Sequence, residues 1–364
     1  MEGKAILKKM SPYQPGKSAE DIMLEYDVKK IVKLASNENP YGYSPSLAQS
    51  LKKFTYDFQF YPDGYATNLR QKISERFNVD NEQIVFGSGS DEIIQIIART
   101  FLQPGTHTIM ATPTFPQYRH HSLIEGAKIT EVPVINGEHN LNQMLAAINE
   151  QTKVIWLCTP NNPTGLSIAP DDFTDFMNQC PKDILVVLDE AYYEFQDSAY
   201  DLQAIEKLKQ YNNLITLRTF SKAYGLASLR VGYAISSKTI AKQLNIVRGP
   251  FNTSHIAQKA ASIAFQDQQF IADSVEKNHR VKQQFYQFLE TINWEYYPTE
   301  ANFILVKTPT SGEHLFNFLI KHGYIIRPGE LLGYPGTVRI TIGEKDDMAT
   351  LHLLLQTYNR QMTE

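Results

Sequence analysis

The chain has 364 residues, of which 42% are hydrophobic and 20% charged, so it can bury a large core and is too apolar for a disordered protein. The 35 Lys and Arg against 39 Asp and Glu give a net charge of −4, which argues against a nucleic-acid or anionic-membrane surface. The two cysteines, Cys158 and Cys180, exclude a disulfide framework and favour a cytoplasmic protein.

The N-terminal region is rich in turn residues and has no apolar core of a secretory signal. The segments "SPYQPGK" and "SNENPYGYSP" indicate an irregular arm. The longest apolar runs, such as residues 184–188, are too short to span a membrane. The nine histidines lack the spacing of metal ligands, so we expect no metal.

Short, continuously apolar segments in the middle of the chain predict strands that are covered on both faces. Segments with helical spacing, such as "DEIIQIIARTFL", separate them, which predicts a three-layer α/β/α domain with a mostly parallel sheet. The predicted strands are residues 83–87, 107–113, 153–160, 183–190, 213–219 and 230–236.

The character of the sequence changes after about Phe251. Residues 254–292 predict one long helix, and two strand-like segments follow, at 302–308 and 338–343. We therefore expect a smaller α+β domain, joined by the N-terminal arm. The predicted limits are 1–43 for the arm and part of the small domain, 44–255 for the large domain and 256–364 for the small domain.

Chemically useful residues follow five of the predicted strands, and in an open parallel sheet ligands bind beyond the carboxyl ends of the strands. The first such segment, "GSGSDE" at 87–92, precedes a helix whose free N–H groups suit an anion. By itself it fits an ordinary capped helix better, since it lacks the full dinucleotide and P-loop patterns. The turn "NNPTG" at 161–165 is likewise either a plain loop or a source of an amide for a ligand.

Asp189 and Lys222 carry the strongest chemical signal. Asp189 follows five apolar residues, so its carboxylate needs a cation or several donors; capping or an ion pair is the plain alternative. Lys222 ends another buried segment, where burial lowers the pKa of an amine and makes it a nucleophile, although a lone lysine is usually a surface charge. Thr219, Ser221 and Arg230 beside it suit a phosphate. A lysine, a phosphate cup and an acid are what pyridoxal phosphate requires.

The ordered set "GSGSDE", "PTFPQY", "PNNPTG", "DEAYYEF" and "TFSKAYGLASLRVGY" resembles the fold-type I pyridoxal-phosphate-dependent aminotransferases. The segments "MSPYQPGK", "KLASNENPYG", "FYPDGY" and "VRITIG" are most similar to the histidinol-phosphate aminotransferases of that family. The resemblance spans almost the whole chain.

The resemblance implies a role for each matching residue. Lys222 would bind the cofactor covalently and carry the substrate proton, and Asp189 would hold the ring nitrogen protonated. Asn162 and Tyr192 would bind the ring oxygen, Phe115 would stack on the ring, and Tyr61 would reach the phosphate of a second subunit in a homodimer. The resemblance also implies a cis Asn162–Pro163 bond. The cofactor phosphate would be bound by Ser90, Asp91, Thr219, Ser221 and Arg230.

The implied reaction is transamination between histidinol phosphate and 2-oxoglutarate, or in reverse between imidazole acetol phosphate and glutamate, in histidine biosynthesis. Arg327 and Arg339, with Tyr13 from the partner's arm, would bind the substrate phosphate; from the sequence alone, Arg339 fits an ordinary strand ion pair equally well. Aromatic amino-acid transamination, phospho-amino-acid decarboxylation and a catalytically silent sensor remain alternatives.

Overall fold

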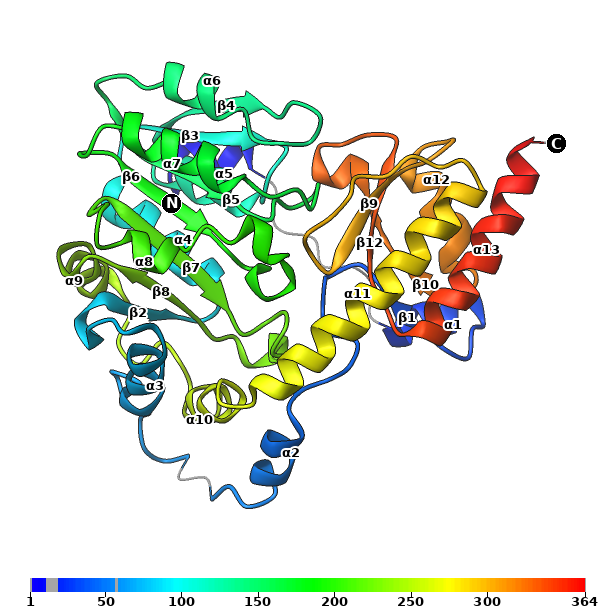
Figure 1. The fold of residues 1–364 in the computed structure, drawn as a ribbon, viewed down its shortest axis with the longest axis horizontal. Helices are drawn as coiled ribbons and strands as arrows, with labels where there is room; N and C mark the ends of the chain where they lie inside the picture. Colours follow the sequence, from blue (N-terminus) through cyan, green and yellow to red (C-terminus); the bar gives the residue numbers. More distant parts are fainter. Residues whose placement is uncertain (1, 11–18, 56–57, 364) are drawn as a thin grey trace.

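A computed structural model describes residues 2–10, 19–55 and 58–363. Its main feature is a seven-stranded sheet in the order β2-β8-β7-β6-β5-β3-β4 (Figure 1). In this sheet β8 alone runs opposite to the other six strands, so the predicted mostly parallel α/β domain is present. The strands are β2 (Ile84–Gly87), β3 (His107–Thr112), β4 (Lys128–Pro133), β5 (Thr152–Cys158), β6 (Leu185–Asp189), β7 (Leu214–Thr219) and β8 (Gly232–Ser236).

Helices cover both faces of this sheet, because successive side chains of each strand point to opposite faces. In β5, Ile155 and Leu157 belong to one apolar cluster, while Val154 and Trp156 belong to the other. The first cluster is completed by α3 (Thr67–Phe77), α6 (Leu141–Ala146), α7 (Pro170–Gln179), α8 (Ala204–Lys207) and α10 (His255–Ala264), and the second by α4 (Ser90–Phe101), α5 (Gln117–Ile124) and α9 (Lys238–Val247).

A third apolar cluster forms the core of a smaller unit. Val32 and Leu34 of the N-terminal segment are part of it, as expected for a small domain that the arm helps to build. Its strands are β9 (Phe303–Lys307), β11 (Arg327–Pro328) and β12 (Thr337–Thr341), with the separate pair β1 (Val32–Lys33) and β10 (Tyr324–Ile325). The remaining α-helices of the described residues are α1 (Ala19–Tyr26), α2 (Pro45–Leu51), α11 (Gln268–Thr291), α12 (Gly312–Ile320) and α13 (Lys345–Thr363).

The single helix predicted over 254–292 is wrong, because the structure has two helices, α10 and α11, with a break at residues 265–267. The Asp267 side chain accepts a hydrogen bond from the Phe270 amide at 3.3 Å, so it caps the start of α11. Helix α10 packs on α2 and α3 in the large unit. The predicted domain limits stay a prediction, and we propose from this packing that the boundary lies within α11.

All strands of this sheet except β8 run in the same direction, including β2, β3, β5, β6 and β7. Their carboxyl ends therefore lie along a single edge of the sheet. Arg339 of β12 reaches that edge, where its Nη1 donates to the Asn162 side-chain oxygen at 2.6 Å. The small unit thus closes the edge at which the sequence places its chemistry.

A buried ion pair joins β7 to the residue that follows β6, next to this edge of the sheet. Arg218 of β7 and Glu190, which follows β6, lie 3.1 Å apart with side chains 6% and 1% exposed. The Arg218 guanidinium also lies 3.5 Å from the centre of the Tyr193 ring. Neither charge is in water, so each depends on the other for its stabilisation.

The Arg218→Met variant is expected to lose about 3–5 kcal/mol of unfolding free energy, because it leaves the Glu190 carboxylate buried without its cation. Replacing both residues by Met is expected to cost less than this single change, since no buried charge remains. Urea denaturation followed by tryptophan fluorescence measures both. A loss below about 1 kcal/mol in the single variant would contradict the dependence of Glu190 on Arg218.

Candidate active site

Lys222 follows β7 and is half-buried at the edge of the sheet formed by the carboxyl ends of the parallel strands. Its Nζ donates to the Ser36 carbonyl oxygen at 3.0 Å and lies 5.9 Å from the centre of the Tyr192 ring. Burial, and then the positive charge of Arg339, lower the pKa of the Lys222 amine to about 8. A sizeable fraction of this amine is therefore neutral at mildly alkaline pH, as a nucleophile requires.

Asp189 ends β6 and is 3% exposed. Its carboxylate accepts hydrogen bonds from the Tyr118 hydroxyl at 2.7 Å and from the Ala191 amide at 3.2 Å. Burial nevertheless raises the pKa of Asp189 to about 7, although the Tyr118 hydrogen bond opposes the shift. These two neutral donors do not fully compensate the buried charge, so the site suits a ligand with a cationic N–H.

The N-terminus of α4, which follows the "GSG" of "GSGSDE", is where the cofactor phosphate is expected to bind, and we call it the phosphate end. Its N-cap, Gly89, gives no side-chain acceptor to the free amides of Ser90 and Asp91. Gly89 has φ +80°, and a Cβ there would lie 2.6 Å from a guanidinium nitrogen of Arg230. Glycine therefore lets the arginine lie against the loop.

Arg230 connects this helix end to the lysine loop. It lies 3.4 Å from the Asp91 carboxylate, and its Nη1 donates to the Ser221 hydroxyl at 3.3 Å. The Ser221 amide in turn donates to the Thr219 hydroxyl at 3.1 Å. Free helix amides, hydroxyls and a guanidinium are the donors that a phosphate dianion needs, so these residues fit the phosphate of the expected cofactor.

Tyr192 and Asn162 lie between the lysine and the small unit. Tyr192 is 4% exposed, and its hydroxyl oxygen accepts the side-chain amides of Asn37 at 2.9 Å and of Asn162 at 3.4 Å. Burial raises the pKa of the Tyr192 phenol well above its ordinary value, so it stays protonated. The Asn162–Pro163 bond is cis, as expected.

Arg339 and Arg327 are directly opposite each other on the antiparallel pair β12 and β11. Opposed residues on neighbouring strands project from the same face, so the two guanidinium groups share one side of this small sheet. Arg339 is 6% exposed and also donates to the Ala35 carbonyl oxygen at 2.6 Å. Its guanidinium therefore connects the Asn162 turn, the N-terminal segment and β12.

The remaining predicted residues are Phe115, Tyr61 and Tyr13. The Phe115 ring meets the Tyr118 ring edge-on, with centroids 5.6 Å apart, and so lies beside the Asp189 partner. Tyr61 is 82% exposed and stacks on Phe251 at 4.7 Å. A pocket of about 820 Å³ is lined by Tyr61, Ser88 and Arg230, and therefore opens at the phosphate end. Tyr13 lies outside the described residues.

Sequence reasoning missed two residues of this site, Asn37 and Tyr118. Both stand in segments that carry the family resemblance, "KLASNENPYG" and "PTFPQY", but without a role. Their partners Tyr192 and Asp189 are 155 and 71 residues away along the chain. The sequence pointed to these two residues only through their positions in the segments that resemble the family. No spacing rule connects residues so far apart along the chain.

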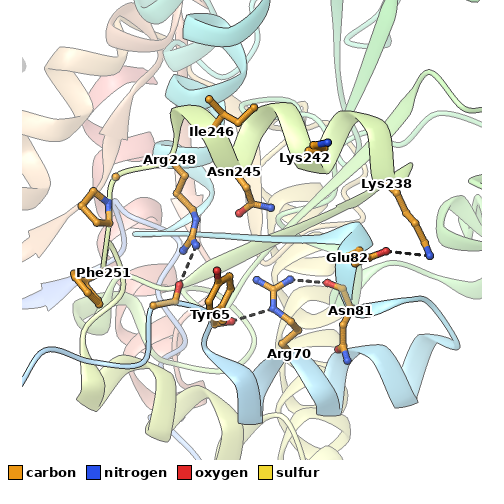
Figure 2. A pocket seen from close by; sticks show the side chains of 13 residues that line it. Tyr65, Arg70, Asn81, Glu82, Lys238, Lys242, Asn245, Ile246, Arg248 and Phe251 are labelled. Carbon is orange, nitrogen blue, oxygen red and sulfur yellow. Dashed lines mark hydrogen bonds and ion pairs between the residues drawn. The ribbon is translucent and has the colours of Figure 1, made fainter.

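A second cavity, of about 870 Å³, lies beneath α9 and contains none of the predicted site residues (Figure 2). Its two arginines have protein partners: Arg70 donates to the Tyr65 carbonyl at 3.0 Å, and Arg248 to the Gly64 carbonyl at 2.9 Å. In the described part of the chain, no cluster of His, Cys, Asp or Glu could hold a metal. No helix there is long and apolar enough to cross a membrane.

Comparisons with known proteins agree with this geometry. The curated histidinol-phosphate aminotransferase 2 of Oceanobacillus iheyensis is 51% identical over 363 residues, which is 100% of each chain. The histidinol-phosphate aminotransferase of Geobacillus sp. is 50% identical over 98% of each chain. The crystal structure of histidinol-phosphate aminotransferase from Sinorhizobium meliloti with pyridoxal-5'-phosphate has a TM-score of 0.90 at 25% identity, covering 99% of this chain and 98% of that one.

The sequence model of the family "Aminotransferase class I and II" matches residues 29–353, almost the whole chain. The predicted fold-type I architecture and the predicted kind of enzyme are thereby confirmed. The chain belongs to the class I and II aminotransferases.

Proposed function

We propose that this aminotransferase uses pyridoxal phosphate to transfer an amino group from glutamate to imidazole acetol phosphate, giving histidinol phosphate and 2-oxoglutarate in histidine biosynthesis. The observation that carries the proposal is the full-length identity of 51% to a curated histidinol-phosphate aminotransferase. The geometry supports it, because Lys222, Asp189 and the phosphate end are the parts that this cofactor needs.

When bound, pyridoxal phosphate supplies an aldehyde that takes up the amino group and a ring that accepts electron density. Asp189 would keep the ring nitrogen protonated, and this cation would relieve the cost of burying the carboxylate. Tyr192 and Asn162, whose side chains contact each other, would bind the ring oxygen. The donors that would hold the phosphate are the Ser90 and Asp91 amides, Thr219, Ser221 and Arg230.

Lys222 would act twice in the reaction. Its neutral amine would hold the cofactor, and the free amine would be the base that moves the substrate proton. The lowered pKa, about 8, suits both tasks near neutral pH. Arg327 and Arg339 would bind the anionic end of each substrate, the phosphate of one and a carboxylate of the other.

We further propose that the enzyme works as a homodimer in the cytoplasm. The exposed aromatic residues Phe58, Phe60 and Tyr61 line the pocket that also contains Arg230, which supports a second copy covering the phosphate end. Both cysteines are free and buried, which is compatible with a reducing compartment.

The substrate is tested by the visible absorbance of the bound cofactor in single-turnover titrations. Histidinol phosphate is expected to discharge the band at low concentration, whereas phenylalanine should require far more. Lys222→Ala is the negative control, and Lys242→Ala, an exposed residue of α9, is the matched positive control. An equal or stronger response to phenylalanine would move the main role to aromatic transamination, and release of CO₂ would indicate a decarboxylase.

The Asp189→Asn variant is expected to abolish most turnover while making the cofactor-free protein more stable at alkaline pH. The folded-state pKa of Asp189 is raised from 3.8 to about 7, so ionisation destabilises the fold increasingly as pH rises from about 4 to 7. Removing this group should therefore gain on the order of 4 kcal/mol at pH 8.5 and almost nothing at pH 4.

Urea denaturation of the cofactor-free wild-type and Asp189→Asn proteins at both pH values measures this difference. Added pyridoxal phosphate should stabilise the wild type more than the variant at pH 8.5. A variant with near-normal turnover would contradict the assignment of Asp189 to the ring nitrogen.

The Arg327→Gln variant is expected to lower kcat/KM for histidinol phosphate by roughly 10–100-fold, because it removes a charge-assisted contact with the phosphate. Histidinol, which lacks the phosphate, is the matched substrate and should be affected several-fold less. Steady-state kinetics with both amines provide the comparison. Equal losses for the two substrates would show that Arg327 does not bind the phosphate.

A further inference from the structure

Three consecutive residues of the N-terminal segment each contact a different functional side chain. The Ala35 carbonyl accepts from Arg339 at 2.6 Å, and the Ser36 carbonyl accepts from Lys222 at 3.0 Å. The third residue, Asn37, uses its side chain, whose Nδ2 donates to the Tyr192 hydroxyl at 2.9 Å. Asn37 is therefore the position in this segment whose contact with a functional residue a substitution can remove without changing a backbone carbonyl.

The position of Asn37 is strongly determined. It is 1% exposed and adopts the left-handed conformation with φ +57°, which Asn tolerates better than most residues. Its backbone N–H donates to the Thr341 hydroxyl at 3.0 Å, and its carbonyl accepts from Asn302 Nδ2 at 3.0 Å. The Thr341 hydroxyl donates to Asn37 Oδ1 at 3.1 Å, which leaves Nδ2 for Tyr192.

The orientation of the Asn162 amide is equally well determined. Arg339 can only donate hydrogen bonds, so the atom of Asn162 that it contacts at 2.6 Å is the oxygen. The Asn162 Nδ2 must then face the Tyr192 hydroxyl, 3.4 Å away. Two amide donors thus converge on one phenol oxygen.

This arrangement decides what the Tyr192 hydroxyl does. A phenol oxygen accepts two hydrogen bonds and donates one. Because Asn37 and Asn162 occupy both accepting positions, the O–H of Tyr192 cannot turn toward either and is directed elsewhere. We propose that Asn37 is a positioning residue that fixes Tyr192 as a hydrogen-bond donor to the ring oxygen of the cofactor, an inference that rests on the proposed function.

A donor at the ring oxygen stabilises negative charge there and so favours the deprotonated form of the bound cofactor. Without the Asn37 amide, the Tyr192 hydroxyl is free to rotate, and this stabilisation weakens. The visible band of the cofactor bound to Lys222 should then titrate at a higher pH. A loss of one such hydrogen bond corresponds to a shift of about one pH unit, or about 1.4 kcal/mol.

The experiment is a spectroscopic pH titration of the cofactor-loaded enzyme, with the Kd for pyridoxal phosphate measured on the cofactor-free protein. Asn37→Gly removes the amide and keeps the left-handed backbone without strain. Asn37→Asp keeps the shape of the side chain and replaces the donor with an acceptor. Both variants are expected to raise the midpoint by about one pH unit and to weaken cofactor binding several-fold.

Asn39→Ala is the matched control. It removes a side-chain amide of the same segment, which donates to the Ala223 carbonyl at 2.8 Å and does not touch Tyr192. Its midpoint should stay within about 0.2 units of the wild type. The aspartate variant keeps the test decisive if the glycine variant fails to fold.

Two results would overturn the inference alone: a midpoint unchanged in the folded Asn37 variants, or one shifted equally by Asn39→Ala. Both leave a normal visible band in the wild type, so the proposed function would survive them. A wild-type protein that binds pyridoxal phosphate without any visible band would overturn the proposed function, and this inference with it.

Discussion

The buried carboxylate of Asp189 is the constraint on which the rest of the site depends. A side chain 3% exposed at the end of a central strand is charged only at an energetic cost, because the two donors that reach it, Tyr118 and Ala191, are neutral. A bound cationic group would offset the free-energy cost of ionising this buried carboxylate. The fold therefore keeps a destabilising group where its ligand binds, which is a common relation between stability and activity. The apolar cluster under α4 and α5 maintains that burial.

The N-terminal segment crosses the site and supplies polar contacts to other buried functional side chains. Residues 35–37 add no apolar core of their own, yet they hold Arg339, Lys222 and Tyr192 through two carbonyls and one amide. All three partners need a polar contact when half or fully buried. The close approach continues at Gly225, where a Cβ would lie 1.8 Å from the Gly42 carbonyl oxygen. The segment thus couples the core of the small unit to the lysine loop.

The sequence allowed prediction of the sheet, because buried parallel strands are continuously apolar. It also indicated the edge where polar residues gather, because the residues that follow these strands are exceptions to the apolar pattern. Lys222 and Asp189 were found in this way. Asn37 and Tyr118 were not, since their roles depend on partners brought close only by the fold. The break between α10 and α11 was missed because helical spacing continues across it, and only the Asp267 cap marks the new start.

Arg339 connects substrate binding with the acid–base state of Lys222. Its positive charge lowers the pKa of that amine, and its guanidinium donates hydrogen bonds to Asn162 and Ala35. An anionic substrate that binds this guanidinium would bring negative charge close to Lys222 and so raise the pKa of its amine. The lysine is therefore a better nucleophile before the substrate arrives and a stronger base afterwards. A single electrostatic contact would adjust one amine to both of its tasks.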